Sequence, residues 1–266
     1  MNQPTSHAIS IQADRAEALR DLHRGPRPLV LGNAWDAASA RVLAKIGYPA
    51  VATTSGGIAE SLGFADHEQA PAEAMFAATA RIAAAVDVPV TADLEAGYGL
   101  APEAVAKQAI ATGVVGLNLE DSDYRLGGLL DLDRQAVRIG AIKQAARRLG
   151  IDLVINARID VYVHRMGPPA SLLGEGLRRA RAYRAAGADC VYPILLDDEA
   201  AIAAFVNDAG APVNIMLRSS TPPLAELVKL GVRRVTVGTG FYRAAMAQLG
   251  EQAAQLHAAA TAMFSK

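Results

Sequence analysis

The chain has 266 residues, of which 52% are hydrophobic, and a formal net charge of −1. This size suffices for one large core, and the charge gives no sign of a surface for nucleic acid or an anionic membrane. The single cysteine, Cys190, excludes an intramolecular disulfide. Residues 1–17 lack the pattern of a signal peptide, and no apolar run approaches the ~18 residues of a membrane-spanning helix. We therefore expect a cytoplasmic globular protein.

Short β-rich runs recur at fairly even intervals. In chain order they are PLVLGNA (28–34), AVATTS (50–55), VPVTADLE (88–95), VGLNLED (115–121), DLVINARID (152–160), CVYPIL (190–195), VNIMLR (213–218) and RRVTVG (233–238). They lack clean period-two alternation, which is typical of parallel strands buried on both faces. Stretches with helical periodicity separate most of them, so the sequence predicts an α/β fold, a (β/α)8 barrel. A doubly wound open sheet is the alternative.

Glycines mark the ends of the predicted helices. Each closes an Ala/Leu-rich stretch just before a strand, where a left-handed cap is wanted: Gly47, Gly113, Gly150, Gly187 and Gly231. No linker or composition break divides the chain, so residues 1–266 are expected to form one domain. A further helical tail is predicted at about residues 244–266.

Polar side chains end most of the predicted strands. The active site of a barrel lies at the C-terminal ends of its strands. The candidate residues are therefore Ser55, Gly56 and Gly57 after the second strand, Asp93 and Glu95 at the third, Glu120 and Asp121 at the fourth, Asn156, Arg158 and Asp160 along the fifth, and Asn214 in the seventh.

The carboxylates at these strand ends indicate a metal site. Ionised carboxylates crowded together repel one another, and a cation resolves that conflict. Oxygen donors without a Cys/His cluster favour Mg2+, or Mn2+, over Zn2+. Asp93, Glu95 and Glu120 are the predicted metal residues, one binding directly and the others holding the water shell. An isolated Asp-x-Glu more often opens a solvated loop, and only the neighbouring Glu120 and Arg158 favour the metal interpretation.

The segment from Ser55 to Gly57 and the Arg158 side chain indicate an anionic substrate. Small residues and a hydroxyl let backbone N–H groups approach an anion, although an ordinary strand-to-helix turn is the alternative. The planar fork of Arg158 can hold a carboxylate by two hydrogen bonds. The alternative for Arg158 is a salt bridge to Asp160 or Glu120.

Four segments in this order resemble the isocitrate lyase/phosphoenolpyruvate mutase superfamily: TTSGGIAESLGFAD (53–66), TADLEAGYG (91–99), GLNLED (116–121) and INARID (155–160). The resemblance runs from about residue 29 to residue 246. It implies a (β/α)8 barrel that binds Mg2+ and an α-keto or α-hydroxy acid in its mouth. It also implies a homotetramer whose subunits exchange a C-terminal helix.

The resemblance further implies roles for individual residues. Asp93 matches the direct metal ligand, and Arg158 matches the arginine over the substrate. The remaining matches are Asp66, Glu95 and Glu120 as carboxylates acting on the metal or its waters, Ser55, Gly56 and Gly57 as the turn that receives the substrate carboxylate, and Trp35 and Asp36 as substrate contacts. The residues expected to carry catalysis are Arg158, Asp66 and Glu120, and Asn214 is expected to contact substrate.

One loop departs from the pattern of the superfamily. Its isocitrate and methylisocitrate lyases share a Lys-Lys-Cys-Gly-His loop after the fourth strand, whose cysteine supplies a proton. Here residues 122–135 read SDYRLGGLLDLDRQ, without cysteine, histidine or lysine, and the lysine and asparagine of the phosphonomutase loop are missing too. Cys190 lies in the run ADCVYPIL and is predicted to be an inert core thiol.

The groups that remain suffice to stabilise an enolate. We therefore expect a Mg2+-dependent carbon–carbon lyase, with decarboxylation of oxaloacetate favoured and water or Tyr98 protonating the enolate. The alternatives are an isocitrate or 2-methylisocitrate lyase with Tyr124 or Arg125 as the acid, a phosphoenolpyruvate/phosphonate mutase-type enzyme, and a non-catalytic α-keto-acid-binding protein. His164 is interpreted as a loop histidine with a local partner.

Overall fold

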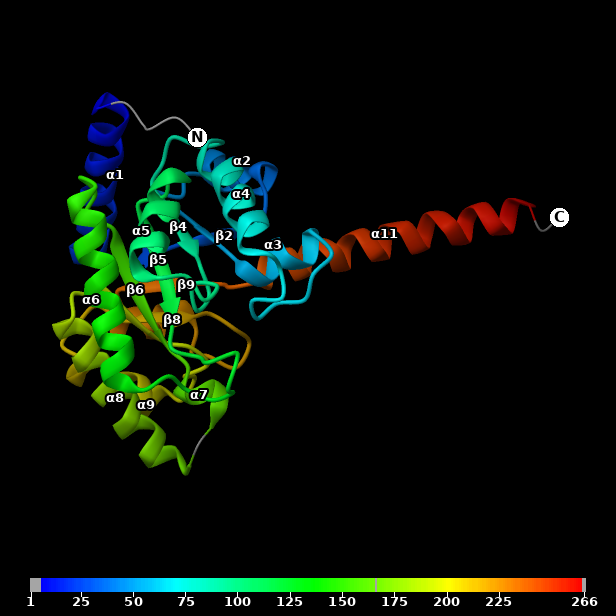
Figure 1. Ribbon diagram of the computed structural model, residues 1–266. Helices are drawn as coiled ribbons and strands as arrows, with labels where there is room; N and C mark the ends of the chain where they lie inside the picture. The colour runs from blue at the N-terminus through cyan, green and yellow to red at the C-terminus, as the bar shows by residue number, and fades with distance from the viewer. Residues whose placement is uncertain (1–5, 166, 265–266) are drawn as a thin grey trace.

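Strands and helices alternate along the computed structural model, which describes residues 6–165 and 167–264 (Figure 1). The strands are β1 (Leu29–Val30), β2 (Gly32–Ala34), β3 (Val51–Thr53), β4 (Val90–Asp93), β5 (Gly116–Glu120), β6 (Val154–Ile159), β7 (Cys190–Pro193), β8 (Asn214–Met216) and β9 (Arg234–Thr236). The helices are α1 (Ser6–Arg24), α2 (Ala37–Ile46), α3 (Ser55–Ser61), α4 (Ala72–Ala83), α5 (Pro102–Ala111), α6 (Leu132–Arg148), α7 (Val161–His164), α8 (Pro169–Ala185), α9 (Glu199–Asp208), α10 (Leu224–Lys229) and α11 (Gly240–Phe264).

The strands close into one parallel barrel. β2 to β7 pair in chain order, and β1, β9 and β8 form a second run of parallel pairs. β1 and β2 are two halves of the first predicted strand, joined by Leu31, whose N–H donates to the Val235 carbonyl at 2.8 Å. A parallel bridge between Val191 and Val213 links β7 to β8. The predicted (β/α)8 barrel is therefore confirmed.

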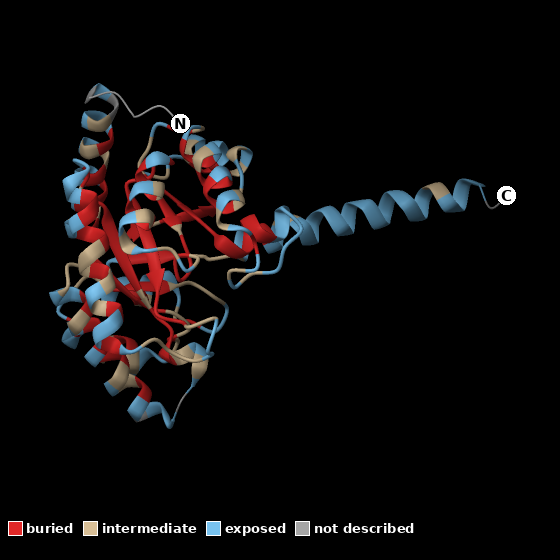
Figure 2. Ribbon diagram, viewed as in Figure 1, coloured by how far each residue is buried: buried red, intermediate tan, exposed pale blue. Residues whose placement is uncertain are grey.

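The strands are buried on both faces, as predicted, but the inner face carries many polar side chains. The strands are coloured as buried in Figure 2, and along β5 the buried Leu117 and Leu119 alternate with the buried Asn118. The Asn118 amide receives a hydrogen bond from Arg234 of β9, a strand that does not pair with β5. Such a contact must cross the barrel interior. The polar residues within the runs therefore face inward, and the apolar ones face the surrounding helices.

Helix α1 covers the N-terminal end of the barrel and was not predicted from the sequence. Its Leu19 packs so closely on Gly116, at the start of β5, that a Cβ there would lie 2.9 Å from a Leu19 methyl. Arg20 donates to Asp189, just before β7, at 3.0 Å. His23 is 2% exposed, its Nδ1–H donates to the Leu19 carbonyl, and its Nε2 faces Arg234 of β9. The last turns of α1 thus reach the starts of three strands.

Acid is expected to destabilise this cap through His23. Burial, with the charge of Arg234, lowers the pKa of His23 to about 4 from 6.5. The unfolded chain therefore takes up this proton first as the pH falls, and the free energy of unfolding should drop by about 3 kcal/mol between pH 7 and pH 4. In His23→Gln, the free energy of unfolding measured by denaturant titration should drop by about 3 kcal/mol less over the same pH range. His7→Gln, exposed at the start of α1, should match the wild type, and an unchanged drop in His23→Gln would refute the assignment.

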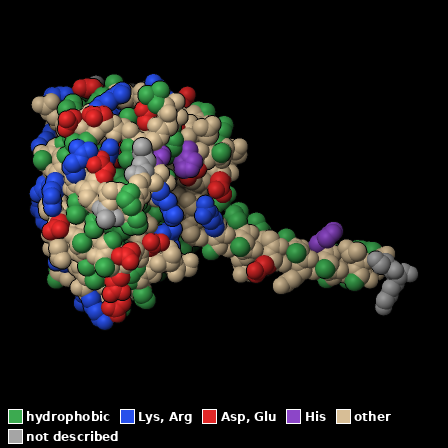
Figure 3. Space-filling model, turned by 90° about the horizontal axis from the view of Figure 1, so that it is seen from below, with side chains coloured by type: hydrophobic (Ala, Val, Ile, Leu, Met, Phe, Trp, Pro, Cys, Tyr) green, Lys and Arg blue, Asp and Glu red, His purple; other side chains and the backbone are tan. Residues whose placement is uncertain are grey.

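Helix α11 runs away from the barrel into solvent (Figures 1 and 2). It begins at Gly240, four residues before the predicted tail, and confirms that tail as helical up to Phe264, while residues 265 and 266 lie outside the described residues. Apolar side chains lie along it, and Leu256 and Met263 are 74% and 75% exposed (Figure 3). No helix within the described ranges is long and apolar enough to cross a bilayer.

Candidate active site

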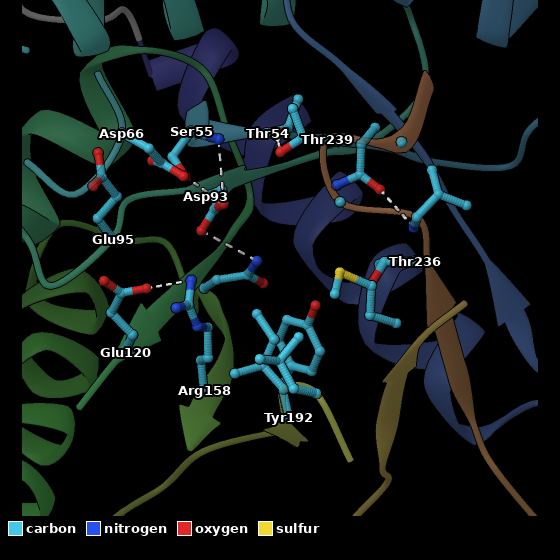
Figure 4. A pocket seen from close by; sticks show the side chains of 18 of the residues that line it. Thr54, Ser55, Asp66, Asp93, Glu95, Glu120, Arg158, Tyr192, Thr236 and Thr239 are labelled. Atoms are coloured by element: carbon cyan, nitrogen blue, oxygen red, sulfur yellow. Dashed lines mark hydrogen bonds and ion pairs between the residues drawn. The ribbon is translucent and has the colours of Figure 1, made fainter. Parts of the chain in front are cut away.

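A cavity of about 570 Å3 opens at the C-terminal ends of the strands (Figure 4). Its walls come from the residues that end or follow seven strands, which is where a barrel carries its active site. Its polar lining includes Ser55, Asp66, Asp93, Glu95, Asn118, Glu120, Tyr124 and Arg158. Its apolar lining includes Val163, Ile194, Leu195, Met216, Leu217 and Val237.

Asp93, at the end of β4, is held at both carboxylate oxygens. Oδ2 accepts hydrogen bonds from the Ser55 backbone N–H at 3.2 Å and the Ser55 hydroxyl at 2.8 Å. Oδ1 accepts one from the Asn118 side-chain amide at 3.4 Å. A carboxylate oxygen can accept about two hydrogen bonds. Oδ1 therefore keeps room for one more partner from the cavity.

Glu95 is buried beneath the mouth of the cavity by two loops that hold each other. The Glu68 N–H donates to the Glu95 carboxylate, the Tyr98 N–H donates to the Glu68 carboxylate, and the Tyr98 hydroxyl lies 3.1 Å from Glu95 Oε1. These three residues, together with His67, have positive φ angles between 49° and 70°, which non-glycine residues rarely adopt. Burial, with the charges of Asp66 and Asp93, raises the pKa of Glu95 to about 7.

Arg158 joins two buried carboxylates. Its Nε and Nη2 donate to the two oxygens of Asp160 at 2.7 and 2.8 Å, and its Nη1 pairs with Glu120. The salt-bridge alternative considered from the sequence is therefore present with both partners. Burial raises the pKa of Glu120 well above its usual range, although Arg158 opposes that shift. One N–H on each Nη atom of Arg158 remains for a ligand in the cavity.

Ser55, Gly56 and Gly57 form the first turn of α3 instead of a free anion-binding turn. The Ser55 N–H and hydroxyl are already directed at Asp93. The two glycines allow close packing: a Cβ on Gly56 would lie 2.8 Å from Asp66 Oδ2, and one on Gly57 would lie 3.1 Å from the Cβ of Trp35. The glycines thus let α3 approach Asp66 on the cavity side.

Three candidate residues lie away from the cavity. The Trp35 ring packs edge-on against Tyr242 at 5.4 Å and lines a separate apolar groove. Asp36 caps α2 by accepting from the Ser39 N–H. Asn214 is fully buried in the barrel interior, where its Oδ1 accepts from the Thr236 hydroxyl at 3.3 Å. The structure does not bring these three side chains together with Asp93.

The three side chains considered from the sequence as proton donors differ in whether they line the cavity. Tyr124 lines the cavity, and its hydroxyl lies 3.1 Å from His67 Nδ1. Burial and the nearby Glu120 carboxylate raise the pKa of Tyr124, so the phenol stays protonated. Arg125 and Tyr98 are not part of the cavity lining.

The two residues predicted to be inert have no part in the cavity. Burial raises the pKa of the Cys190 thiol to about 12, which confirms a core thiol. His164 Nε2 lies 3.0 Å from the Ser122 hydroxyl, which confirms a local partner.

The oxygen donors of the cavity suit a hard divalent cation. Among residues 6–165 and 167–264, no three His, Cys, Asp or Glu side chains converge into a metal cage. Glu120 is buried beside Arg158 and Tyr124. Asp93 with one open position, together with the carboxylates near it, fits an ion that keeps much of its water shell, as Mg2+ does.

Sequence comparison gives the cavity a family context. Residues 19–257 match the phosphoenolpyruvate phosphomutase family. An uncharacterized protein of Mycobacterium tuberculosis is 35% identical over 86% of this chain and 84% of its own length. The oxaloacetate decarboxylase of Ectopseudomonas mendocina is 29% identical over 86% and 80% of the two chains. A solved structure of 2,3-dimethylmalate lyase superposes with a TM-score of 0.80 at 29% identity, covering 91% of this chain and 87% of that one.

Proposed function

The chain belongs to the phosphoenolpyruvate phosphomutase family, and from this premise we propose that it is a Mg2+-dependent carbon–carbon lyase. Its substrate is a small α-keto or 2-hydroxy carboxylic acid, and the favoured reaction is decarboxylation of oxaloacetate. The observation that carries the proposal is the Asp93 carboxylate, which faces the cavity with one open position and is surrounded by oxygen donors and Arg158. Asp93 would hold the ion directly, and Glu95, Glu120 and Asp66 would hold its waters.

The proposed reaction needs few groups. Mg2+, when bound, supplies Lewis-acid polarisation of the 2-oxo group. The C3–C4 bond breaks and CO2 leaves. The electron pair of that bond stays with the remaining fragment, which becomes an enolate with its negative charge on the 2-oxo oxygen. The free Nη hydrogens of Arg158 stabilise that negative charge in a buried setting, where such contacts are strong. A proton from water or the Tyr124 hydroxyl then reaches C3 and yields pyruvate. No loop cysteine is required.

A second candidate is cleavage of a larger 2-hydroxy di- or tricarboxylate, and the position of Tyr124 favours it. In this reaction a basic group takes the 2-hydroxyl proton, the C2–C3 bond breaks to give a 2-oxo acid, and the electron pair left on C3 must take up a proton from a positioned acid. The Tyr124 hydroxyl lies on the cavity wall at the place in sequence where the lyase loop begins. Isocitrate and 2-methylisocitrate are the test substrates for this alternative.

The deciding experiment measures pyruvate release from oxaloacetate by the wild type, Asp93→Ala and Asp87→Ala at equal Mg2+. The equal Mg2+ matters because the free ion itself speeds this decarboxylation. Asp87 is exposed and distant from the cavity lining, so its variant should match the wild type. We expect Asp93→Ala to lose at least about 100-fold in rate.

The other outcomes separate the alternatives. Glyoxylate from isocitrate or pyruvate from 2-methylisocitrate, without oxaloacetate turnover, would favour the lyase. Activity of Asp93→Ala equal to the wild type would refute the site. If no product forms from any of the three substrates, the phosphonate mutase and binding-protein alternatives remain.

Gly56→Ala is expected to reduce activity with little loss of stability. The new methyl group would displace the Asp66 carboxylate, which is the end of a flexible side chain. Misplacing a positioned group by about 1 Å costs roughly 10- to 100-fold in rate. Gly174→Ala is the matched control, because Gly174 lies in α8 with nothing within 4 Å of a Cβ. Equal kcat/KM values for the two variants would show that the approach of α3 to Asp66 is unimportant.

We also propose that the protein assembles through α11 into a homotetramer whose subunits exchange this helix. The exposed apolar side chains of α11 support the proposal.

A further inference from the structure

A buried cation lies in the barrel beneath the candidate site. Arg234 of β9 has no exposed surface, and among the described residues no carboxylate lies within ion-pair distance of it. Its Nη1 faces His23 Nε2 at 3.5 Å, its Nη2 donates to Asn118 Oδ1 at 3.3 Å, and its Nε has no partner there. An unpaired buried charge is costly, so its retention calls for a functional reason.

Arg234 dictates how the Asn118 amide is oriented. An arginine can only donate hydrogen bonds, so the Asn118 atom that faces it must be the oxygen. The same oxygen accepts from Asn156 Nδ2 at 2.9 Å. The Asn118 amino group then faces Asp93 Oδ1 at 3.4 Å. If the amide were reversed, its amino group would face the donors of Arg234 and Asn156, and its oxygen would face the Asp93 carboxylate. Both contacts would be repulsive.

We propose that Asn118 is the positioning residue that fixes the Asp93 carboxylate for cation binding, with its own amide oriented by Arg234 and Asn156. Ser55 holds one Asp93 oxygen (Figure 4), and Asn118 holds the other. Each contact removes rotational freedom from Asp93. The inference rests on the proposed function, in which Asp93 binds the divalent ion.

The test measures Mn2+ binding by the electron paramagnetic resonance signal of the free ion. The proteins are the wild type, Asn118→Leu, Asp93→Ala and Gln12→Leu. Leucine resembles asparagine in size but cannot donate to Asp93. Gln12 is the matched control, because its buried amide donates to the Ile110 and Val114 carbonyls, and none of these three residues lines the cavity. Asn118→Leu should weaken Mn2+ binding by about 10- to 100-fold, as loss of a ligand's hydrogen-bond partner does.

Stability and metal binding should separate in these variants. Asn118→Leu and Gln12→Leu both lose buried hydrogen bonds and should both melt earlier, but only Asn118→Leu should lose Mn2+ affinity. If Asn118→Leu does not fold, Asn118→Ala leaves room for a water to accept from Arg234, and it should show the same loss of affinity.

Two failures are distinguishable. Wild-type Mn2+ affinity in a folded Asn118 variant, with binding lost in Asp93→Ala, would overturn the role of Asn118 and leave the proposed metal site standing. Wild-type affinity in Asp93→Ala would instead overturn the metal assignment of the proposed function.

Discussion

Arg158→Met is expected to lower the free energy of unfolding by about 3–5 kcal/mol, the usual cost of removing one partner from a buried ion pair. Arg158 is the ion-pair partner of both Glu120 and Asp160, and these carboxylates are 1% and 0% exposed. Without it, both must lose their charge by taking up protons or remain as unpaired buried anions. Denaturant titration followed by circular dichroism measures the change and does not depend on any assumption about the substrate.

The pH dependence of the lost stability shows whether the unpaired carboxylates cause it. Loss of Arg158 removes the charge that opposes the raised pKa of Glu120, so the folded variant holds a proton on Glu120 more tightly. The deficit of the variant relative to the wild type should therefore grow as the pH rises through the folded-state pKa of Glu120.

A surface pair gives the matched control for this substitution. Arg178→Met breaks a two-point pair with Glu175 on an exposed side chain and should cost about 1 kcal/mol or less. A deficit in Arg158→Met that is small, or independent of pH, would contradict the ion-pair account.

The barrel could be predicted from the sequence because its strands are short apolar runs separated by helical stretches that end in glycine. Gly47 illustrates this: it adopts φ 105° and donates its N–H to the carbonyls that end α2. Helix α1 escaped prediction because its buried stripe is not apolar. Gln12, Arg20 and His23 lie buried in it beside Ala16 and Leu19. Their burial depends on contacts with residues at or just before strands, more than a hundred residues away in the chain.

The candidate site could be predicted for residues whose position on a strand decides where the side chain points. Asp93, Glu120 and Arg158 end strands with their side chains inward, and all three line the cavity. Trp35 was not predictable in this way, because its ring turns toward Tyr242 of α11. Asn118 and Arg234 were read as parts of apolar runs. Their importance comes from a contact across the barrel, which no local pattern in the sequence records.

The apolar surface of α11 supports the proposed assembly. Between residues 244 and 264 the sequence holds only one charged residue, Glu251. A helix of 25 residues is about 37 Å long and would not normally expose such a composition to water. An apolar groove of about 500 Å3 lies near its root, between α2 and Phe241. The groove includes Val42 and Ile46, which are 57% and 70% exposed. We propose that α11 of a second copy covers this surface.

Removing residues 244–266 is therefore expected to convert the proposed tetramer to single chains, because the truncated protein would lose the helix that we propose crosses to a partner. Light scattering coupled to gel filtration measures the mass, against 27.7 kDa for one full chain. Leu256→Glu should weaken assembly in the full chain, because a charge would be buried in the interface. Leu126→Glu is the matched control, since Leu126 is 87% exposed in a loop apart from α11. A monomeric wild type, or a tetramer that survives the truncation, would rule out exchange of α11.

Decarboxylation by the truncated monomer would then show whether the cavity, which includes Gly240 and Arg243 at the root of α11, works within one chain.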